Sequence, residues 1–396
     1  MSETKNTGVV PAEVDKNMTA AAADASGLVW RNAKDVPFDI YGLYEPRAEG
    51  AFRRMPDEVA AAVNAGVKRN ARHTAGGRVR FTTDSRRIAL RVKMPYVTKY
   101  CHMALTGSSS FDIYEDTPVG SAYVGVYKPA VSITDGFEQI FTLPDSRERS
   151  LTLNFPLYSP VSELEIGLDA GASLSGGKKY TGTRLPVVYY GSSITQGACA
   201  SRPGLAYQAV ISRRLDVDFI NLGFSGNALG EIPMVEYMAA LPMSAFVCDY
   251  DHNAPNPEYL RSTHYKAYAK VRAAHPDMPI IMITRPNVAT NGASAMERKD
   301  VVIDTYRAAR DAGDRNVYYV DGESFFLGKY ENECTMDGVH PNDLGFTLMA
   351  EGIESEIRRA LQAEAAAIRE RLPKGGAVVA LCIEGKPCSS EELSRR

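Results

Sequence analysis

The sequence predicts an α/β protein in which an antiparallel β-sandwich precedes a doubly wound parallel sheet of five strands. Two changes of rhythm along the chain support this. From Leu28 to about Leu174, short segments with period-two alternation are separated by turn residues, which is typical of an antiparallel sandwich. From Leu185, buried strands alternate with amphipathic helices, which indicates a parallel sheet with helices on both faces. The length of 396 residues leaves room for two or three domains.

In the sandwich region, the segments 87–92 and 111–114 alternate cleanly between apolar and polar residues. Further strand candidates follow the same pattern, at 78–81, 122–127, 139–143, 151–155 and 164–168. A helix-like insertion at 56–67 interrupts them. The polar, alanine-rich residues 1–27 are predicted to form a loose arm, and residues 175–184, rich in Gly, Lys and Thr, a linker. The region 28–174 is predicted to form a separate accessory domain.

The domain predicted for residues 185–371 follows the order strand, helix, strand, helix. Its strands are expected at 185–190, 217–222, 245–250, 279–284 and 316–320. Asn256 and Pro257 predict an N-cap and first-turn proline for a helix to about Ala274, and Gly313 a C-terminal stop for the helix 296–312. The last helix carries one apolar face, formed by Phe346, Met349, Ile353, Ile357 and Leu361. Residues 372–396 are predicted to form a C-terminal tail, in which 377–383 could add an edge strand.

Composition and charge limit the possible partners. With 44% apolar and 23% charged residues, the chain has the composition of an ordinary globular protein. A net charge of −3 predicts neither a nucleic-acid nor an anionic-membrane surface. No apolar run approaches transmembrane length, and residues 1–6 lack the basic start of a secretory signal, so a cytoplasmic location is expected. The oligomeric state is left open.

The six cysteines indicate neither a zinc site nor a disulfide framework, because none forms a CxxC pair. Cys199 lies close to Ser193, but no activating partner is visible in the sequence, so a packing role is expected. The glycine patterns lack the lysine of a phosphate-binding loop. An alternative reading of Asp249 and His252 as metal ligands is weak, because suitable companions are absent elsewhere. No metal or cofactor is therefore expected.

The segment from Tyr190 to Gly197 is the centre of the functional prediction. It joins a buried strand to an amphipathic helix, which places its serines at the carboxyl edge of the sheet beside helix-terminal N–H groups. Taken alone, this could be an ordinary turn of small residues. The interpretation strengthens because three further polar segments follow later strands, at 223–227, 251–253 and 337–341. Functional loops gather at this edge of a doubly wound sheet.

Together these segments resemble the blocks of the SGNH, or GDSL-like, hydrolase superfamily of esterases and acylhydrolases. The resemblance spans about residues 185–365. It rests on Gly191–Thr195 for the Gly-Asp-Ser-Leu block, Gly226 for the block II glycine, Asn253 for the block III asparagine, and Asp337 with His340 for the Asp-x-x-His block. It implies a flavodoxin-like sheet, and the preceding sandwich resembles that of some two-domain esterases of this superfamily. Such a domain could bind sugar, support the active site or stabilise the protein. Position alone suggests that one of its loops borders the catalytic cleft.

The resemblance implies Ser193 as the nucleophile, His340 as the general base and Asp337 as the residue that orients it. Asp337 lies three residues before His340, so in a tight loop the two side chains can meet. The oxyanion hole would comprise the backbone N–H groups of Ser193 and Gly226 and the side-chain amide of Asn253. Each residue also has a purely structural alternative. Asp337 could cap a helix, His340 could be a surface residue, Gly226 could serve a turn and Asn253 could cap a loop.

The chain departs from the family pattern in two blocks. Ser192 stands where the family usually has Asp, a supporting position, and the block III motif keeps only its Asn. The second departure brings Asp251 and His252 near the expected pocket, where they would contact substrate or stabilise the loop. Arg202 and Tyr207 are further candidates for substrate binding.

These features predict a serine esterase that hydrolyses small acyl esters through an acyl-enzyme, with acetyl esters of carbohydrate as the specific expectation. That last step rests on the architecture alone. Two alternatives stay open: an acyltransferase with the same triad, and a carbohydrate-binding protein with an inactive hydrolase domain.

Overall fold

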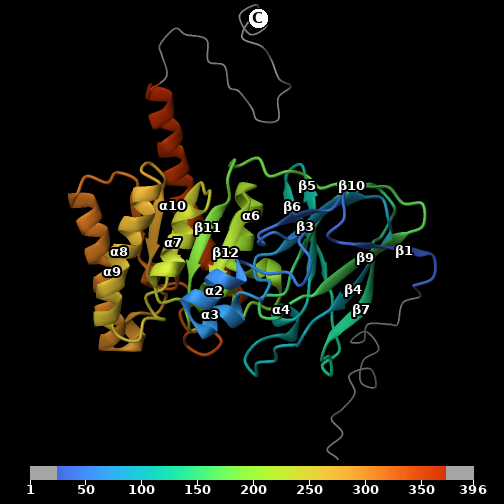
Figure 1. The fold of residues 1–396 in the computed structure, drawn as a ribbon, viewed down its shortest axis with the longest axis horizontal. Helices are drawn as coiled ribbons and strands as arrows, with labels where there is room; N and C mark the ends of the chain where they lie inside the picture. Colours follow the sequence, from blue (N-terminus) through green and yellow to red (C-terminus); the bar gives the residue numbers. More distant parts are fainter. Residues whose placement is uncertain (1–24, 372–396) are drawn as a thin grey trace, which may run out of the picture.

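The computed structural model describes residues 25–371, with side chains through residue 363. The predicted C-terminal tail, including the candidate edge strand 377–383, and most of the predicted arm 1–27 lie outside the described residues. Figure 1 shows the two parts of the described chain side by side, the sandwich in blue to green and the α/β part in green to red.

Two antiparallel sheets form the sandwich, as predicted. One has the order β1 (Leu28–Asn32), β9 (Glu163–Asp169), β4 (Arg87–Lys93) and β7 (Gly136–Thr142). The other has the order β10 (Leu174–Gly176), β3 (Arg78–Thr83), β8 (Arg149–Asn154), β5 (Asp112–Thr117) and β6 (Gly120–Val126), with β2 (Asp39–Tyr41) also paired to β3. The core between them takes alternate residues of the strands, such as Ile88, Leu90 and Val92.

The short strands β1, β2 and β10 were not predicted. Strand β10 ends at Gly176, so the sheet extends into the segment predicted as a linker. The helix-like insertion is two helices, α2 (Asp57–Val63) and α3 (Ala65–Asn70). Asn64 separates them because its backbone is extended and its side chain accepts a hydrogen bond from the Val67 N–H at 2.8 Å, which starts a second helix.

The α/β part has a five-stranded parallel sheet, as predicted. The strand order is β12 (Phe219–Gly223), β11 (Val187–Gly191), β13 (Ala245–Asp249), β14 (Ile280–Ile283) and β15 (Val317–Val320). One face packs against α6 (Tyr207–Leu215) and α10 (Asp343–Arg371). The other face packs against α7 (Ile232–Ala240), α8 (Pro257–Ala274) and α9 (Ala293–Asp311). The chain reverses direction across the sheet at β11, so the carboxyl ends of β11 and β13 form a switch point where ligands bind in such folds.

The predicted helix signals are confirmed. Asn256 accepts a hydrogen bond from the Tyr259 N–H, Pro257 begins α8, and Gly313 has a positive φ directly after α9. The predicted apolar face of α10 packs on the sheet: Phe346, Met349, Ile353 and Ile357 are buried and Leu361 is partly buried. The domain boundaries 28–174 and 185–371 stay predictions.

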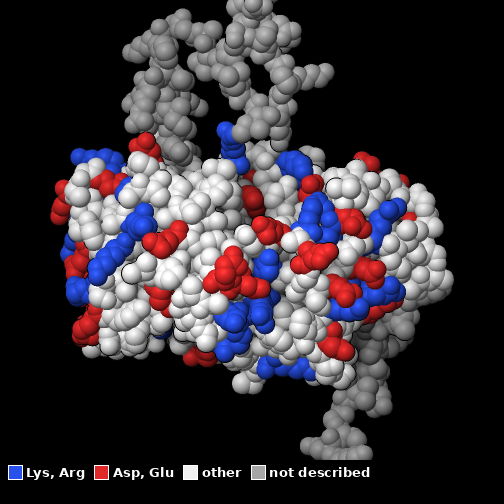
Figure 2. Space-filling model, in the orientation of Figure 1, with Lys and Arg blue, Asp and Glu red and all other residues white. Residues whose placement is uncertain are grey.

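The surface charges are mixed in sign. Figure 2 shows acidic and basic side chains interspersed over one face. Among the described residues, every helix is too short or too polar to cross a bilayer.

Candidate functional site

Ser193 begins a single helical turn, α5 (Ser193–Gln196), directly after strand β11. Ser192 caps this turn, since its hydroxyl accepts a hydrogen bond from the Ile194 N–H at 3.2 Å. The preceding Gly191 is required, because a Cβ there would lie 2.1 Å from the carbonyl oxygen of Asp249. The backbone therefore turns sharply at the sheet edge and leaves Ser193 half-buried at the start of the helix.

The Ser193 hydroxyl meets the imidazole of a loop 147 residues later in the chain. Ser193 Oγ lies 2.8 Å from His340 Nε2, and His340 Nδ1 lies 2.7 Å from Asp337 Oδ2. A bridge between Thr335 and Pro341 closes the loop and so brings Asp337 and His340 together. The sequence-based expectation of contact between residues 193 and 340 is therefore met by the geometry.

The Asp337 carboxylate is held in its ionised form. Partial burial alone would raise its pKa, but hydrogen bonds from the backbone of His340 and Val339 and from the imidazole outweigh burial and lower the pKa to about 2. An ionised carboxylate at Nδ1 favours the tautomer with the proton on Nδ1. The lone pair of His340 Nε2 then faces the Ser193 hydroxyl, and such a pair can transfer a proton.

Gly226 and Asn253 lie on the two loops that follow β12 and β13. Gly226 has φ +69°, and a Cβ at this position would meet no atom within 4 Å. Glycine is favoured here by its positive φ and not by lack of space, because a larger side chain would have room at this position. The Asn253 side-chain amide donates to the carbonyl oxygen of Phe224 at 3.0 Å, which ties the two loops together. Their assignment to an oxyanion hole stays a prediction.

A network of hydrogen bonds that was not predicted from the sequence supports the loop of Gly226. It includes side chains from the N-terminal region. Gln196 Nε2 donates to His73 Nδ1 at 3.0 Å, and Gln196 Oε1 accepts from the Ser225 N–H at 3.0 Å. The side chain of Asn70 donates to the Ser225 carbonyl oxygen at 3.1 Å. Burial lowers the pKa of His73 to about 3, so this histidine stays neutral and its Nδ1 can accept.

Arg54 reinforces the same connection. Its guanidinium is buried and, within residues 25–371, has no carboxylate partner. It donates to four carbonyl oxygens at 2.6–3.0 Å, those of Asn70, His73, Asn221 and Gly223. Burial lowers its pKa to about 9. The planar fork of this residue thus joins α3 to the end of β12. Only the position of Gln196, three residues after Ser193, could have signalled this network in the sequence.

Aromatic rings of the sandwich side reach the catalytic loop. Ring contacts run from Tyr158 to Tyr100, from Tyr100 to His102 and from His102 to His340, with centroids 5.7 to 5.8 Å apart. The Tyr158 hydroxyl also donates to the Ser193 carbonyl oxygen at 3.2 Å. A loop of the sandwich region therefore borders the site, as predicted.

Three of the four predicted substrate contacts have partners inside the protein, and their role in substrate binding stays a prediction. Arg202 forms an ion pair with Asp112 at 3.0 Å, between the two parts of the chain. Tyr207 is fully buried and stacks on Phe346. Asp251 is 1% exposed and accepts from the Arg285 N–H at 3.3 Å. The positions of these residues in the sequence could not show that their side chains are paired or buried.

His252 is partly exposed beside Asp251, so its role in substrate binding stays a prediction. Below the nucleophile turn, Asp249 accepts from the Thr195 hydroxyl at 3.1 Å. Burial and the neighbouring Asp251 raise the pKa of Asp249 well above its ordinary value, which favours a neutral carboxyl. Burial and Asp337 raise the pKa of Cys199 to about 12, so its thiol is not an activated nucleophile.

Comparison with protein families gives two matches. Residues 184–358 match the model of the GDSL-like lipase/acylhydrolase family. Residues 28–174 match a model described as the N-terminus of SGNH-hydrolase-type esterases. No curated protein matches the chain.

Several solved structures share the fold. A GDSL-like lipase from Bacteroides ovatus is 27% identical, with a TM-score of 0.77 over 85% of this chain and 98% of that one. The salicylyl-acyltransferase SsfX3 from a tetracycline biosynthetic pathway is 19% identical, with a TM-score of 0.70 over 86% and 99%. An acetyl xylan esterase from Butyrivibrio proteoclasticus is 12% identical, with a TM-score of 0.54 over 85% and 99%. The arrangement of a sandwich followed by an α/β domain is thus shared along the length of each of these proteins.

Proposed function

Residues 184–358 belong to the GDSL-like lipase/acylhydrolase family, and from this premise we propose that the protein, a hydrolase, is a serine esterase with Ser193, His340 and Asp337 as its catalytic triad. The contact of 2.8 Å between Ser193 Oγ and His340 Nε2 carries the proposal. A hydroxyl is a weak nucleophile unless a base takes its proton during attack, and this contact supplies the base.

In the proposed mechanism, Ser193 Oγ attacks the ester carbonyl while its proton passes to His340 Nε2. The imidazolium that forms is stabilised by the ionised Asp337 at Nδ1. Collapse of the tetrahedral intermediate breaks the bond to the alcohol, which leaves with the proton from Nε2. Water then attacks the acyl-enzyme by the same route and releases the carboxylic acid.

The developing oxyanion needs preorganised donors. We assign the backbone N–H groups of Ser193 and Gly226 and the amide of Asn253, because Ser193 starts a helix and the other two sit on loops fixed by hydrogen bonds. Loss of one such donor typically costs about 3 kcal/mol in the transition state.

For the substrate we propose a small acyl ester of a carbohydrate, with acetyl as the acyl group. The resemblance in fold to an acetyl xylan esterase supports this choice. The rings of Tyr100 and His102 beside His340 support it too, since aromatic faces pack well against the apolar faces of sugars.

The nucleophile is tested by labelling the folded protein with a fluorophosphonate and locating the adduct by peptide mass spectrometry. We expect the adduct on Ser193, with none on the Ser193→Ala variant. Ser192→Ala is the matched control, because it removes the neighbouring hydroxyl and should keep the adduct. Folded wild-type protein that forms no adduct would favour a carbohydrate-binding protein with an inactive hydrolase domain.

An acyltransferase with the same triad is the second candidate, favoured by the structural similarity to the salicylyl-acyltransferase. A panel of acetyl, butyryl and longer aryl esters, followed by acetylated oligosaccharides, tests the substrate. Each is measured at increasing concentrations of an acceptor alcohol. An esterase forms mainly free acid throughout, whereas an acyltransferase shifts its product to the new ester at low acceptor concentration.

A further inference from the structure

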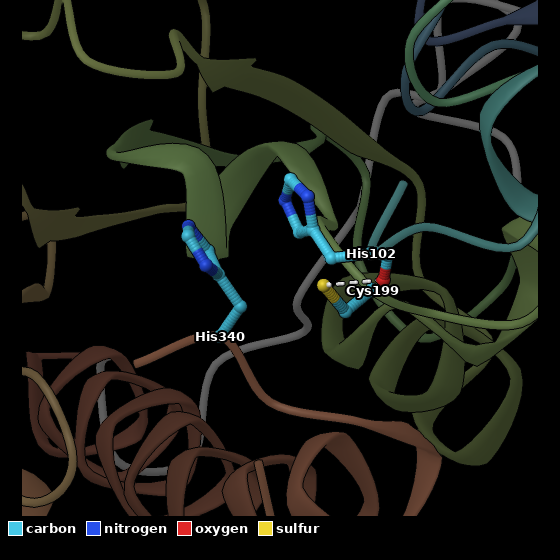
Figure 3. Close-up of side chains that lie close together, drawn as sticks. All are labelled: His102, Cys199 and His340. Carbon is cyan, nitrogen blue, oxygen red and sulfur yellow. Dashed lines mark hydrogen bonds between the residues drawn. The ribbon is translucent and has the colours of Figure 1, made fainter. Parts of the chain in front are cut away.

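Three potential metal ligands lie close together, and one of them is the proposed base, His340. One ligand atom each from His102, Cys199 and His340 lies within 4.8 Å of the other two. Figure 3 shows the two imidazole rings facing each other and the Cys199 sulfur directed toward the space between them. The residues come from three distant segments, so no spacing in the sequence could reveal the cluster.

We propose that His102, Cys199 and His340 bind a soft divalent cation such as Zn²⁺, and that the bound ion reversibly inhibits the enzyme. Zinc takes nitrogen and sulfur ligands at about 2.0–2.3 Å in tetrahedral sites, which places two nitrogens and one sulfur about 3.3–3.6 Å apart. The ligand atoms lie within 4.8 Å of one another, so the proposal requires side-chain rotations that shorten the longest separation by about 1 Å. Water or the Ser193 hydroxyl completes the fourth position.

The surroundings of His340 suit a metal ligand. Its Nδ1 donates a hydrogen bond to the Asp337 carboxylate at 2.7 Å, so the lone pair of Nε2 points away from Asp337. Such carboxylate–histidine pairs commonly orient metal ligands and strengthen them. A thiolate and two imidazoles without a carboxylate in the first coordination sphere select zinc-like ions over Mg²⁺ or Ca²⁺.

The loops that carry His102 and Cys199 are fixed to each other. Gly107 approaches the Ala200 carbonyl so closely that a Cβ would lie 2.0 Å from its oxygen, and the Thr106 hydroxyl donates to the Ser201 carbonyl at 2.6 Å. The Cys199 thiol donates to the His102 carbonyl at 3.5 Å. The site is therefore largely preformed.

Cys199 also adopts an unusual backbone conformation, with φ +69°. A residue other than glycine pays about 1–3 kcal/mol for such a conformation, and such residues cluster at functional sites. The conformation aims the sulfur at the two imidazoles (Figure 3).

Inhibition follows from competition for one lone pair. The ion displaces the Cys199 proton to solvent and binds His340 Nε2, which then cannot accept the Ser193 proton. This inhibitory part rests on the proposed function, whereas binding of the ion by the three side chains does not.

Binding is tested on chelator-treated full-length protein with Co²⁺, whose complex with a thiolate absorbs in the near ultraviolet. We expect one Co²⁺ per chain, with affinity reduced at least about tenfold in Cys199→Ser and in His102→Gln. Cys101→Ser is the matched control, because it removes an exposed thiol next to His102 and should bind as the wild type does. An unchanged spectrum in Cys199→Ser, or a spectrum that depends on Cys101, would overturn the site.

Inhibition is tested with Zn²⁺ before fluorophosphonate labelling of Ser193 and before ester hydrolysis. We expect Zn²⁺ to block both in the wild type and in Cys101→Ser, and a chelator to restore them. The half-inhibitory concentration should rise at least about tenfold in Cys199→Ser and His102→Gln. Unimpeded labelling at saturating Zn²⁺ would overturn the inhibitory part. Failure of labelling in the absence of metal would count against the proposed function. The Co²⁺ spectrum would still show whether the three side chains bind a metal.

Discussion

At Asp337, a carboxylate with a pKa of about 2 lies 2.7 Å from the Nδ1 of His340. Asp337→Asn keeps the shape of the side chain but removes the charge and can favour the wrong imidazole tautomer. In the proposed mechanism kcat then falls on the order of 10³- to 10⁴-fold. Steady-state hydrolysis of an aryl acetate measures this, with the melting temperature as a check on folding. A variant that kept more than a tenth of the wild-type kcat would contradict the role of Asp337.

His264 is a second residue whose environment makes a measurable prediction. It is buried, stacks on Tyr250 and lies with Nδ1 2.9 Å from the Thr305 hydroxyl. Since Thr305 donates to the Val301 carbonyl, Nδ1 is the donor to Thr305. Burial lowers the pKa of His264 to about 4.

The sign of the pH effect follows from that shift. The folded state disfavours the protonated imidazole, so the contribution of His264 is fully present above its unfolded pKa of about 6.5 and is lost as the pH falls toward 4. At pH 5 the loss is about 2 kcal/mol. We expect His264→Asn to flatten the decline in unfolding free energy between pH 7 and pH 5, measured by urea denaturation. The buried His73 contributes equally to the decline in both proteins, so the difference between them reports on His264. An equally steep decline in the variant would therefore refute the assignment.

At the scale of elements, Arg54 joins α3, which packs against the α/β part, to the end of β12. Arg54→Met leaves the carbonyl oxygens of Asn221, Gly223, His73 and Asn70 without this donor in a buried site. Each unsatisfied buried group costs about 1–3 kcal/mol, so we expect the variant to lose at least about 3 kcal/mol of unfolding free energy. Calorimetric melting measures the change.

Arg53→Met is the matched control for that experiment. Arg53 is the neighbouring residue, but its partners Asp57 and Glu45 are solvent-exposed. Surface ion pairs contribute about 0–1 kcal/mol, so this variant should melt close to the wild type. Equal melting temperatures for the two variants would show that the fork of Arg54 is not what connects the elements.

At the scale of the whole molecule, the sandwich and the α/β part share buried polar contacts. Besides Arg54, the ion pairs Arg78–Asp218 and Arg202–Asp112 join them, and both arginines pack against aromatic rings. Separating the two parts would expose these charged groups to water or leave them buried without their partners. We therefore expect a single cooperative transition in calorimetry of the full chain. Two resolved transitions, one for each part, would contradict this coupling.

The sequence by itself determined the class of each domain and the polar segments that meet at the sheet edge. These depend on local signals: the period of apolar residues, the cap at Asn256, and the Gly191–Thr195 turn after a buried strand. The contact between residues 193 and 340 could be predicted too, because the resemblance to the SGNH hydrolases pairs these two residues. It agrees with the sheet, since the carboxyl ends of parallel strands and their loops lie at one edge.

Only the tertiary structure decided which polar residues face the site and which are enclosed. Tyr207 and Asp251, predicted from sequence as substrate contacts, are buried, and Arg202 is paired with Asp112. His73 and Gln196 carry no motif and yet support the loop of Gly226. His102, Cys199 and His340 likewise converge from three segments. Burial and convergence depend on how the two domains pack together, and contacts between distant residues leave no periodic pattern along the chain.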